Sequence, residues 1–212
     1  MEDEQILTKK ERRELHRQEK REMLEVSAAK RTTKKYLMWV IVLLFISAII
    51  YGAYILSKSS EPEGEDFSLS IPVLSERDHI PVGAKPVVAY NSNPPTSGQH
   101  YDKPAKPGFR EEIIADGHLI HSLEHGLVLV SYNPRISKEA DKLREIVGPL
   151  TVVVSREAND MDIALAAWGR LDTFDLGDGA IDDNDLRRIG DFIKRWSNKG
   201  PERIPAGQHG GI

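Results

Sequence analysis

An uncharged run of 22 residues, Tyr36 to Ser57, constrains this chain more than any other feature of its sequence. A helix rises ~1.5 Å per residue, so a run of this length crosses a hydrocarbon core about 30 Å thick. A cleaved signal peptide would have a shorter apolar stretch and a short basic lead, whereas a hydrophilic arm of 35 residues precedes this run. The sequence therefore predicts one transmembrane helix over residues 36–57, retained as a signal anchor.

The charges on the two sides of this helix differ in sign. Acidic residues follow it within residues 58–66, and basic residues crowd the positions before it. The basic residues are Lys30, Arg31, Lys34 and Lys35. The cytoplasmic ends of transmembrane helices carry an excess of Lys and Arg. We therefore expect a single-pass protein of the cell membrane, with a cytoplasmic N-terminus, an extracytoplasmic C-terminal domain and the lipid bilayer as a partner.

Composition divides the rest of the chain into four parts. We expect residues 1–35 to form a charged cytoplasmic arm and residues 58–70, rich in Ser, Glu, Pro and Gly, to form a flexible linker. Residues 71–205 are numerous enough for one hydrophobic core, and residues 206–212 are expected to be a disordered tail. Glutamates interleave the cations of the arm, and residues 58–212 carry 25 acidic against 18 basic residues. We therefore expect no nucleic-acid partner.

The outer region reads as an α+β domain. Four short apolar runs bounded by turn residues predict strands, and two segments with helical spacing predict helices. The predicted strands are Val87–Tyr90, Leu127–Tyr132, Leu150–Ser155 and Ile163–Trp168. The predicted helices are residues 138–147 after Ser137 and residues 186–196 after the capping Asp185. We expect a mainly four-stranded sheet with two to three helices.

The chain contains no cysteine, which limits the chemistry available to it. A disulfide framework, a thiol nucleophile, an iron–sulfur cluster and a cysteine-type zinc site are all excluded. Any metal site must therefore be built from imidazoles and carboxylates.

Histidines supply the strongest chemical signal. Five of the seven lie between His79 and His125. His118, His121 and His125 are spaced by three and four residues, so a helix there places them along one face. The pair His121 and His125 has the spacing that brings two imidazole nitrogens to one metal ion, and Gly126 can end the helix sharply.

The sequence also offers further ligands for such an ion. His100 follows a stiff Pro-Pro-Thr-Ser-Gly turn, which would present its ring in a fixed direction. The predicted ligands are therefore His100, His121 and His125, with His79 and His118 in reserve. We expect Glu124, Ser97 and Trp168 to surround and orient them. Without a thiolate, this donor set suits zinc or copper, and the sequence does not choose between them.

Two other functions fit the same residues. The string from His121 to His125 matches the H-x-x-E-H pattern of inverted zinc peptidases, in which the glutamate activates water, so Glu124 could be the general base of a metal-dependent hydrolase. Alternatively, the histidines and Glu124 could form a buried hydrogen-bond network in a metal-free module that binds an envelope protein partner. The sequence leaves open whether the protein is an enzyme.

Three blocks of residues together resemble domain-of-unknown-function family 3105. They are residues 93–101 (NPPTSGQHY), residues 121–126 (HSLEHG) and residues 167–170 (AWGR), in this order and spacing. The resemblance spans about residues 75–202 and departs from the family at Gln99, where a proline is expected. It implies a bacterial or archaeal protein with an N-terminal membrane anchor and one outward-facing domain, and it supplies no mechanism.

Overall fold

The structure is a computed structural model that describes residues 9–59, 61–202, 204, 211 and 212. The chain forms two compact units, one up to Ser59 and one from Ser60 onward.

The first unit is the helix α1, Lys9–Ser59. Its segment Lys34–Ile55 is long and apolar enough to cross a membrane, by length and composition. The large apolar side chains described in this segment are exposed, including Trp39, Leu43 and Phe45. The predicted apolar helix is therefore present, and its place near the N-terminus is consistent with a signal anchor or a signal sequence.

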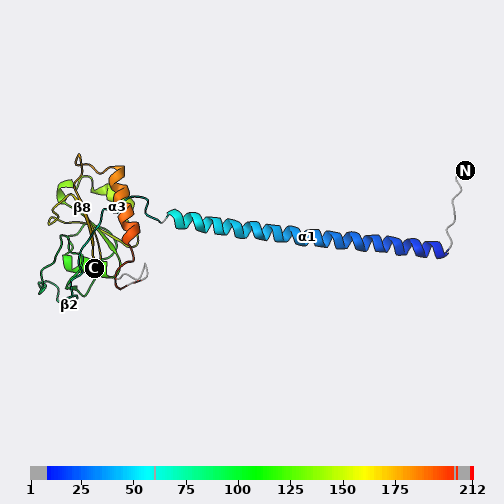
Figure 1. The fold of residues 1–212 in the computed structure, drawn as a ribbon, viewed down its shortest axis with the longest axis horizontal. Helices are drawn as coiled ribbons and strands as arrows, with labels where there is room; N and C mark the ends of the chain where they lie inside the picture. Colours follow the sequence, from blue (N-terminus) through cyan, green and yellow to red (C-terminus); the bar gives the residue numbers. More distant parts are fainter. Residues whose placement is uncertain (1–8, 60, 203, 205–210) are drawn as a thin grey trace. The chain divides into compact units, whose positions relative to one another are not determined.

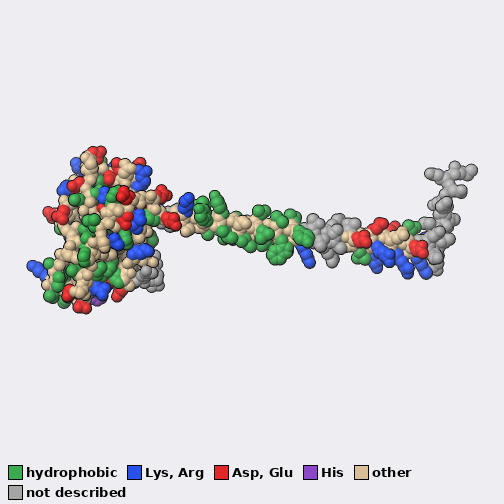
Figure 2. Space-filling model, in the orientation of Figure 1, with side chains coloured by type: hydrophobic (Ala, Val, Ile, Leu, Met, Phe, Trp, Pro, Cys, Tyr) green, Lys and Arg blue, Asp and Glu red, His purple; other side chains and the backbone are tan. Residues whose placement is uncertain are grey.

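The part of α1 that precedes this segment is charged on two sides. Arg13, Arg17 and Lys20 project in similar directions at 100° per residue, and Glu22 and Glu25 project to roughly the opposite side. Figure 2 shows the blue and red side chains of this arm lying largely apart. Over residues 12–25, this helix therefore has a mainly basic side and a mainly acidic side.

The second unit is built on a six-stranded mixed sheet, in the order β1-β8-β7-β5-β6-β4 (Figure 1). β4 and β5 run parallel to β6, and the other neighbours are antiparallel. The strands are β1 (Leu69–Ser70), β4 (Gly108–Arg110), β5 (Val128–Tyr132), β6 (Thr151–Ser155), β7 (Ile163–Ala167) and β8 (Arg170–Phe174). The α+β class is confirmed, and the expected four-stranded sheet is corrected to six strands.

Helices cover both faces of this sheet. On one face, Val128 and Val130 pack with the helix α3, Asp183–Trp196. On the other, Leu129 packs with the helix α2, Asp116–Glu124. Because successive side chains of a strand point to opposite faces, the continuous apolar run of β5 indicates a strand buried on both sides.

Three of the four predicted strands are confirmed as β5, β6 and β7. The fourth, Val87–Tyr90, is wrong, because this segment lies at the surface and Val87 is 85% exposed. The backbone N–H of Val87 donates to the side-chain oxygen of Gln99, at 2.7 Å, rather than to a neighbouring strand.

The sequence did not predict β8 because its apolar alternation is interrupted by Arg170 and Asp172. Asp172 is nevertheless only 3% exposed, and Arg188 of α3 donates to its two carboxylate oxygens at 2.5 and 2.9 Å. The two bonds from the guanidinium satisfy the hydrogen-bonding needs of this buried carboxylate, so the strand tolerates it. The charged residue also interrupts the apolar pattern from which a strand is predicted.

The two predicted helices are present with altered limits. Residues 138–147 form a 3-10 helix, Ala140–Ile146, that has no side-chain cap at its N-terminus. A shorter 3-10 helix, Pro134–Ile136, precedes it. α3 begins earlier than expected because Asp182 is its cap, and Asp185 reaches back to the Asp182 N–H to complete a capping box.

Described residues within the expected linker pack on the outer domain. The Asp191 carboxylate of α3 accepts the N–H groups of Glu63 and Gly64 at 3.0 and 2.6 Å, and β1 joins the sheet. In the expected tail, residues 206–210 lie outside the described residues. The Ile212 backbone is described and exchanges hydrogen bonds with Pro104 and Lys106.

Arg156 holds together two segments that lead to the histidines. Its guanidinium donates to both carboxylate oxygens of Asp116, at 2.8 Å each, at the start of α2. It also donates to the side-chain oxygen of Asn93, at 2.5 Å, in the turn before His100. The Arg156 side chain is 10% exposed and that of Asp116 is 31% exposed, so the arginine is the better shielded partner.

We predict that Arg156→Ala lowers the free energy of unfolding by about 2 kcal/mol, because it removes the two-point partner of the half-buried Asp116 carboxylate. Arg156→Lys should cost about half as much, since an ammonium makes no bidentate contact. Denaturant unfolding of the full-length protein in detergent measures both. Arg187→Ala, at an exposed position of α3, is the control and should change stability by no more than about 0.5 kcal/mol.

Candidate metal centre

Helix α2 carries His118, His121 and Glu124, His125 follows it directly, and its C-terminal end is fixed. Its last turn is closed by Gly126, whose φ of +86° is one that residues with side chains rarely adopt. The backbone of Gly200 lies so close to the Glu124 carbonyl that an added Cβ would stand 2.1 Å from it. The N–H of Glu202 donates to the same carbonyl at 3.0 Å. The helix end that bears Glu124 and His125 is thus held by the C-terminal loop.

A two-stranded parallel sheet brings two further histidines to this helix. It consists of β2, His79–Ile80, and β3, His100–Tyr101, with His79 directly opposite His100. Residues opposite each other in a sheet place their side chains on the same face, so the two rings lie together. The Tyr101 ring packs onto Gly117 of α2, where an added Cβ would stand 2.7 Å from the ring. Glycine at this position allows β3 to approach the helix.

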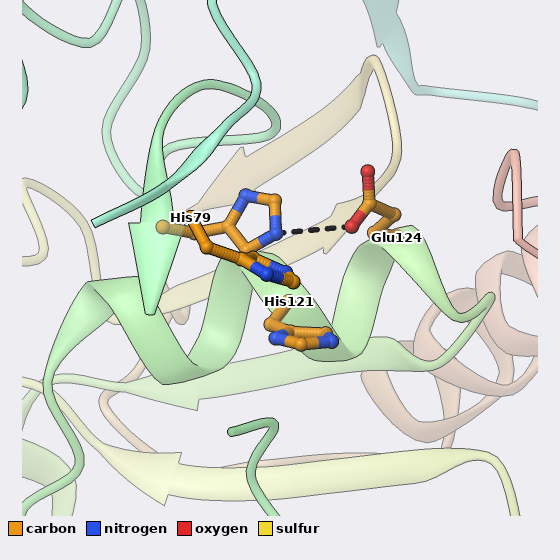
Figure 3. Close-up of side chains that lie close together, drawn as sticks. His79, His121 and Glu124 are labelled. Carbon is orange, nitrogen blue, oxygen red and sulfur yellow. Dashed lines mark ion pairs between the residues drawn. The ribbon is translucent and has the colours of Figure 1, made fainter. Parts of the chain in front are cut away.

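The four side chains that converge are His79, His100, His121 and Glu124. One ligand atom from each lies within 4.8 Å of all the others (Figure 3). His100 and His121 are 0% and 5% exposed, Glu124 is 8% exposed, and His79 lies at the surface. The centroids of the three imidazole rings are 4.9 to 5.0 Å apart. These three nitrogens and one oxygen are able to surround a single metal ion.

Backbone carbonyls fix which nitrogen each buried ring offers. The Nδ1 of His100 lies 2.8 Å from the Gly98 carbonyl, and the Nδ1 of His121 lies 2.6 Å from the Tyr101 carbonyl. A carbonyl only accepts, so each Nδ1 is the N–H donor. When the rings are neutral, both Nε2 lone pairs are therefore available to an ion, and metal-binding histidines are commonly oriented in this way.

Charge in the centre is concentrated on one contact, between the Nε2 of His100 and a carboxylate oxygen of Glu124 at 3.0 Å (Figure 3, dashed line). Burial opposes the charged form of His100, but its bonds to Glu124 and Gly98 outweigh burial and raise its pKa. Burial likewise opposes the carboxylate and is the largest single influence, but the bond from His100 and the charges of the neighbouring histidines together outweigh it and lower the pKa of Glu124. For His121, burial prevails over the bond to Tyr101 and lowers the pKa. In the metal-free protein, His100 and Glu124 therefore share a proton within the group of four.

Two of the predicted residues lie beside this group. The Nε2 of His125 is 3.0 Å from the Nε2 of His121 and 3.5 Å from a carboxylate oxygen of Glu202. His118, 7% exposed, faces Lys103, whose carbonyl lies 2.6 Å from its Nδ1. His125 thus contacts a member of the group, and His118 ties α2 to the segment after β3.

Ser97 and Trp168 contact segments that surround the centre. The Ser97 hydroxyl accepts the N–H of Leu74 at 3.1 Å, which attaches the segment that leads to His79. Trp168 packs against the apolar cluster on the α2 face of the sheet, which includes Leu123. Neither is a member of the group of four.

The sequence placed His79 in reserve and assigned Glu124 an orienting role, and the structure brings both into the group. The clustering of histidines between His79 and His125 was the available signal for His79. The pairing of β2 with β3 is only two residues long, which is too short to produce a recognisable alternation of apolar and polar residues.

Residues 82–208 match the family described as "Protein of unknown function (DUF3105)". The chain belongs to the DUF3105 family. No curated protein and no solved structure matches it. The matched DUF3105 region includes His100, His121 and Glu124, and His79 lies just before it.

We predict a pH-dependent contribution of the His100–Glu124 contact to the stability of the metal-free protein. The raised pKa of His100 gives a contribution that is complete below its ordinary value of 6.5 and is lost as the pH rises through the raised value. The lowered pKa of Glu124 gives one that is present above 4.5 and is lost as the pH falls through the lowered value. The contribution is therefore greatest between pH 4.5 and 6.5.

Melting temperatures of the metal-free, full-length protein within this pH range and above it test the contact, with Glu124→Gln as the comparison. The variant should lose the decline above pH 6.5, because His100 no longer has an anionic partner. An identical decline in both proteins would show that the contact does not govern it.

Proposed function

We propose that this protein is a membrane-anchored metal-binding protein whose outer domain holds one zinc or copper ion. The ligands are His79, His100, His121 and Glu124. The helix α1 tethers the domain to the lipid bilayer, and the site serves metal sensing, metal carriage or the structure of the domain.

The observation that supports this proposal most strongly is the direction of the lone pairs. The carbonyls of Gly98 and Tyr101 leave the Nε2 atoms of neutral His100 and His121 without protons, and the Glu124 carboxylate lies beside them. Such a set of acceptors requires a cation between its members, and in the metal-free protein that cation is the proton shared by His100 and Glu124. A metal ion meets that requirement with ligands that are already oriented, so little conformational entropy opposes binding.

The donor atoms favour zinc or copper over calcium and magnesium. Three imidazole nitrogens and one carboxylate oxygen suit borderline metals, whereas calcium and magnesium prefer oxygen alone. The Nε2 of His125, 3.0 Å from that of His121, adds a fourth nitrogen, and so a fifth donor, near the same region. Copper(II) accepts five donors readily, and zinc is most often held by four.

The first competing function is the metal-dependent hydrolase. A general base must keep its carboxylate free to take a proton from a metal-bound water. Here the Glu124 oxygen lies 3.0 Å from the Nε2 of His100 and within the set of candidate ligands. This position supports a ligand role for Glu124 in preference to the role of base.

The second competing function is the metal-free module that binds an envelope protein. The contacts of His100 with Glu124 and of His121 with His125 form part of the hydrogen-bond network that such a module would need. The metal-binding function and this one differ in a single measurable property, which is the metal content.

Elemental analysis of the full-length protein, purified in detergent without a histidine tag, tests the proposal. We predict close to one zinc or copper ion per chain and a loss of nearly all of it in His100→Ala/His121→Ala, since removing two of four ligands costs most of the affinity. His118→Ala, which alters a buried histidine of the same helix, should keep its metal. A metal-free parent whose melting temperature is unmoved by added zinc or copper would leave the interaction module as the better account.

Glu124→Gln separates the metal-binding function from the hydrolase. A neutral amide is a poor metal ligand, so we predict that this variant binds the ion at least about tenfold more weakly. Retention of parental affinity together with loss of a hydrolytic activity would support the hydrolase instead. Competition titration against a chelator of known affinity measures this difference.

The proposed orientation is cytoplasmic for the N-terminal arm and extracytoplasmic for the domain, on the basis of Lys34 and Lys35 before the apolar segment. Because the chain has no cysteine, a single introduced thiol reports its own location. We predict that Lys138→Cys reacts with a membrane-impermeant maleimide in intact cells, and that Glu19→Cys reacts only after the cells are permeabilised. The reverse pattern would place the domain in the cytoplasm.

A further inference from the structure

A hollow of about 550 Å³ opens beside His79, the exposed member of the group of four. Its wall combines an apolar run with one acidic and one basic residue. The lining residues are His79, Ile80, Pro81, Val82, Asp102 and Lys103. A small molecule in this hollow would therefore lie next to a metal ligand.

The four ligands are not held equally. His100, His121 and Glu124 are buried, and the two buried rings are fixed by backbone carbonyls. His79 is exposed and extends from β2, which is two residues long. Because His79 is the most exposed and least constrained of the four, its bond to the ion is the one expected to break first.

The segment around His79 is attached at its two ends. The N–H of Leu74 donates to Ser97, and the N–H of Val87 donates to Gln99. Between these attachments, β2 pairs with β3, and the Asp78 carbonyl accepts the N–H of His100 at a long 3.4 Å. A segment with so little packing opens locally at lower free energy than the core.

We propose that the ion is exchanged through this hollow, where a small aminocarboxylate chelator takes the coordination position of His79. This inference rests on the proposed metal-binding function. The coordinate bond to the His79 imidazole breaks and one to a carboxylate oxygen of the chelator forms, while His100, His121 and Glu124 keep the ion. The metal keeps its oxidation state throughout. Further donors of the chelator then draw the ion out.

The charges of the wall select this class of ligand. The Lys103 ammonium attracts a carboxylate, and Asp102 beside it accepts from an amine. The apolar wall of Ile80 and Val82 suits a ligand with a short hydrocarbon frame. Amino acids and synthetic aminocarboxylates share this combination of groups.

The test uses the full-length protein in detergent, loaded with cobalt(II), whose visible absorption reports metal still bound. Nitrilotriacetate is the aminocarboxylate probe, and 1,10-phenanthroline is a neutral chelator for comparison. We predict that metal loss to nitrilotriacetate accelerates with its concentration and then saturates, as the hollow fills. Lys103→Glu should slow this loss about tenfold, because the local charge changes by two units, and should leave the loss to phenanthroline unchanged.

Two further variants separate the hollow from general effects. Lys106→Glu makes the same charge change at an exposed position three residues away and should behave as the parent. His79→Ala should release cobalt faster to both chelators, because the first bond to break is already missing. Equal slowing by Lys103→Glu and Lys106→Glu, a rate independent of chelator concentration, or unchanged release from His79→Ala would each overturn the proposal. Failure of the parent to bind cobalt at all would instead count against the proposed metal-binding function.

Discussion

The contact between His100 and Glu124 is the interaction on which the centre depends. It joins β3 to α2 across 3.0 Å, between two side chains that are almost removed from water. Desolvating such a pair is costly, so the surrounding structure must supply partners for every remaining polar atom. Gly98 does so for the second nitrogen of His100. The close approach of Tyr101 to Gly117 brings β3 near enough to the helix for the contact to form.

Sequence reasoning predicted the part of the centre that follows from local spacing. The spacing of the histidines suited a helix, which the structure forms over Asp116–Glu124, and the stiff turn before His100 pointed to a candidate ligand that is distant in sequence. Sequence did not predict how His79 joins them, because a two-residue pairing between β2 and β3 leaves no periodic signal. It also did not indicate that Glu124, one position before His125, would point to the ion-binding side.

The same distinction holds for the fold. Strands buried on both faces, such as β5, are continuous apolar runs and were predicted from them. β8 was not predicted because it contains a charged residue, Asp172. That residue can be buried only because Arg188, on the helix α3, donates two hydrogen bonds to it. The residues after the apolar helix look flexible by composition, yet Asp191 fixes them with two hydrogen bonds. In each case the missing information was a specific long-range contact, and single-sequence patterns record only local preferences.

The unequal attachment of the ligands connects the fold to the proposed exchange of metal. An ion held by four equally buried ligands leaves only when the domain opens, and its binding energy then adds to folding stability. Here three of the four proposed ligands belong to the packed part of the domain, and His79 belongs to a segment held mainly at its ends. With the proposed ligands, the cost of releasing a bound ion would therefore be confined to that segment. This arrangement favours metal carriage or sensing over a purely structural role for the ion, because it allows exchange without unfolding the sheet.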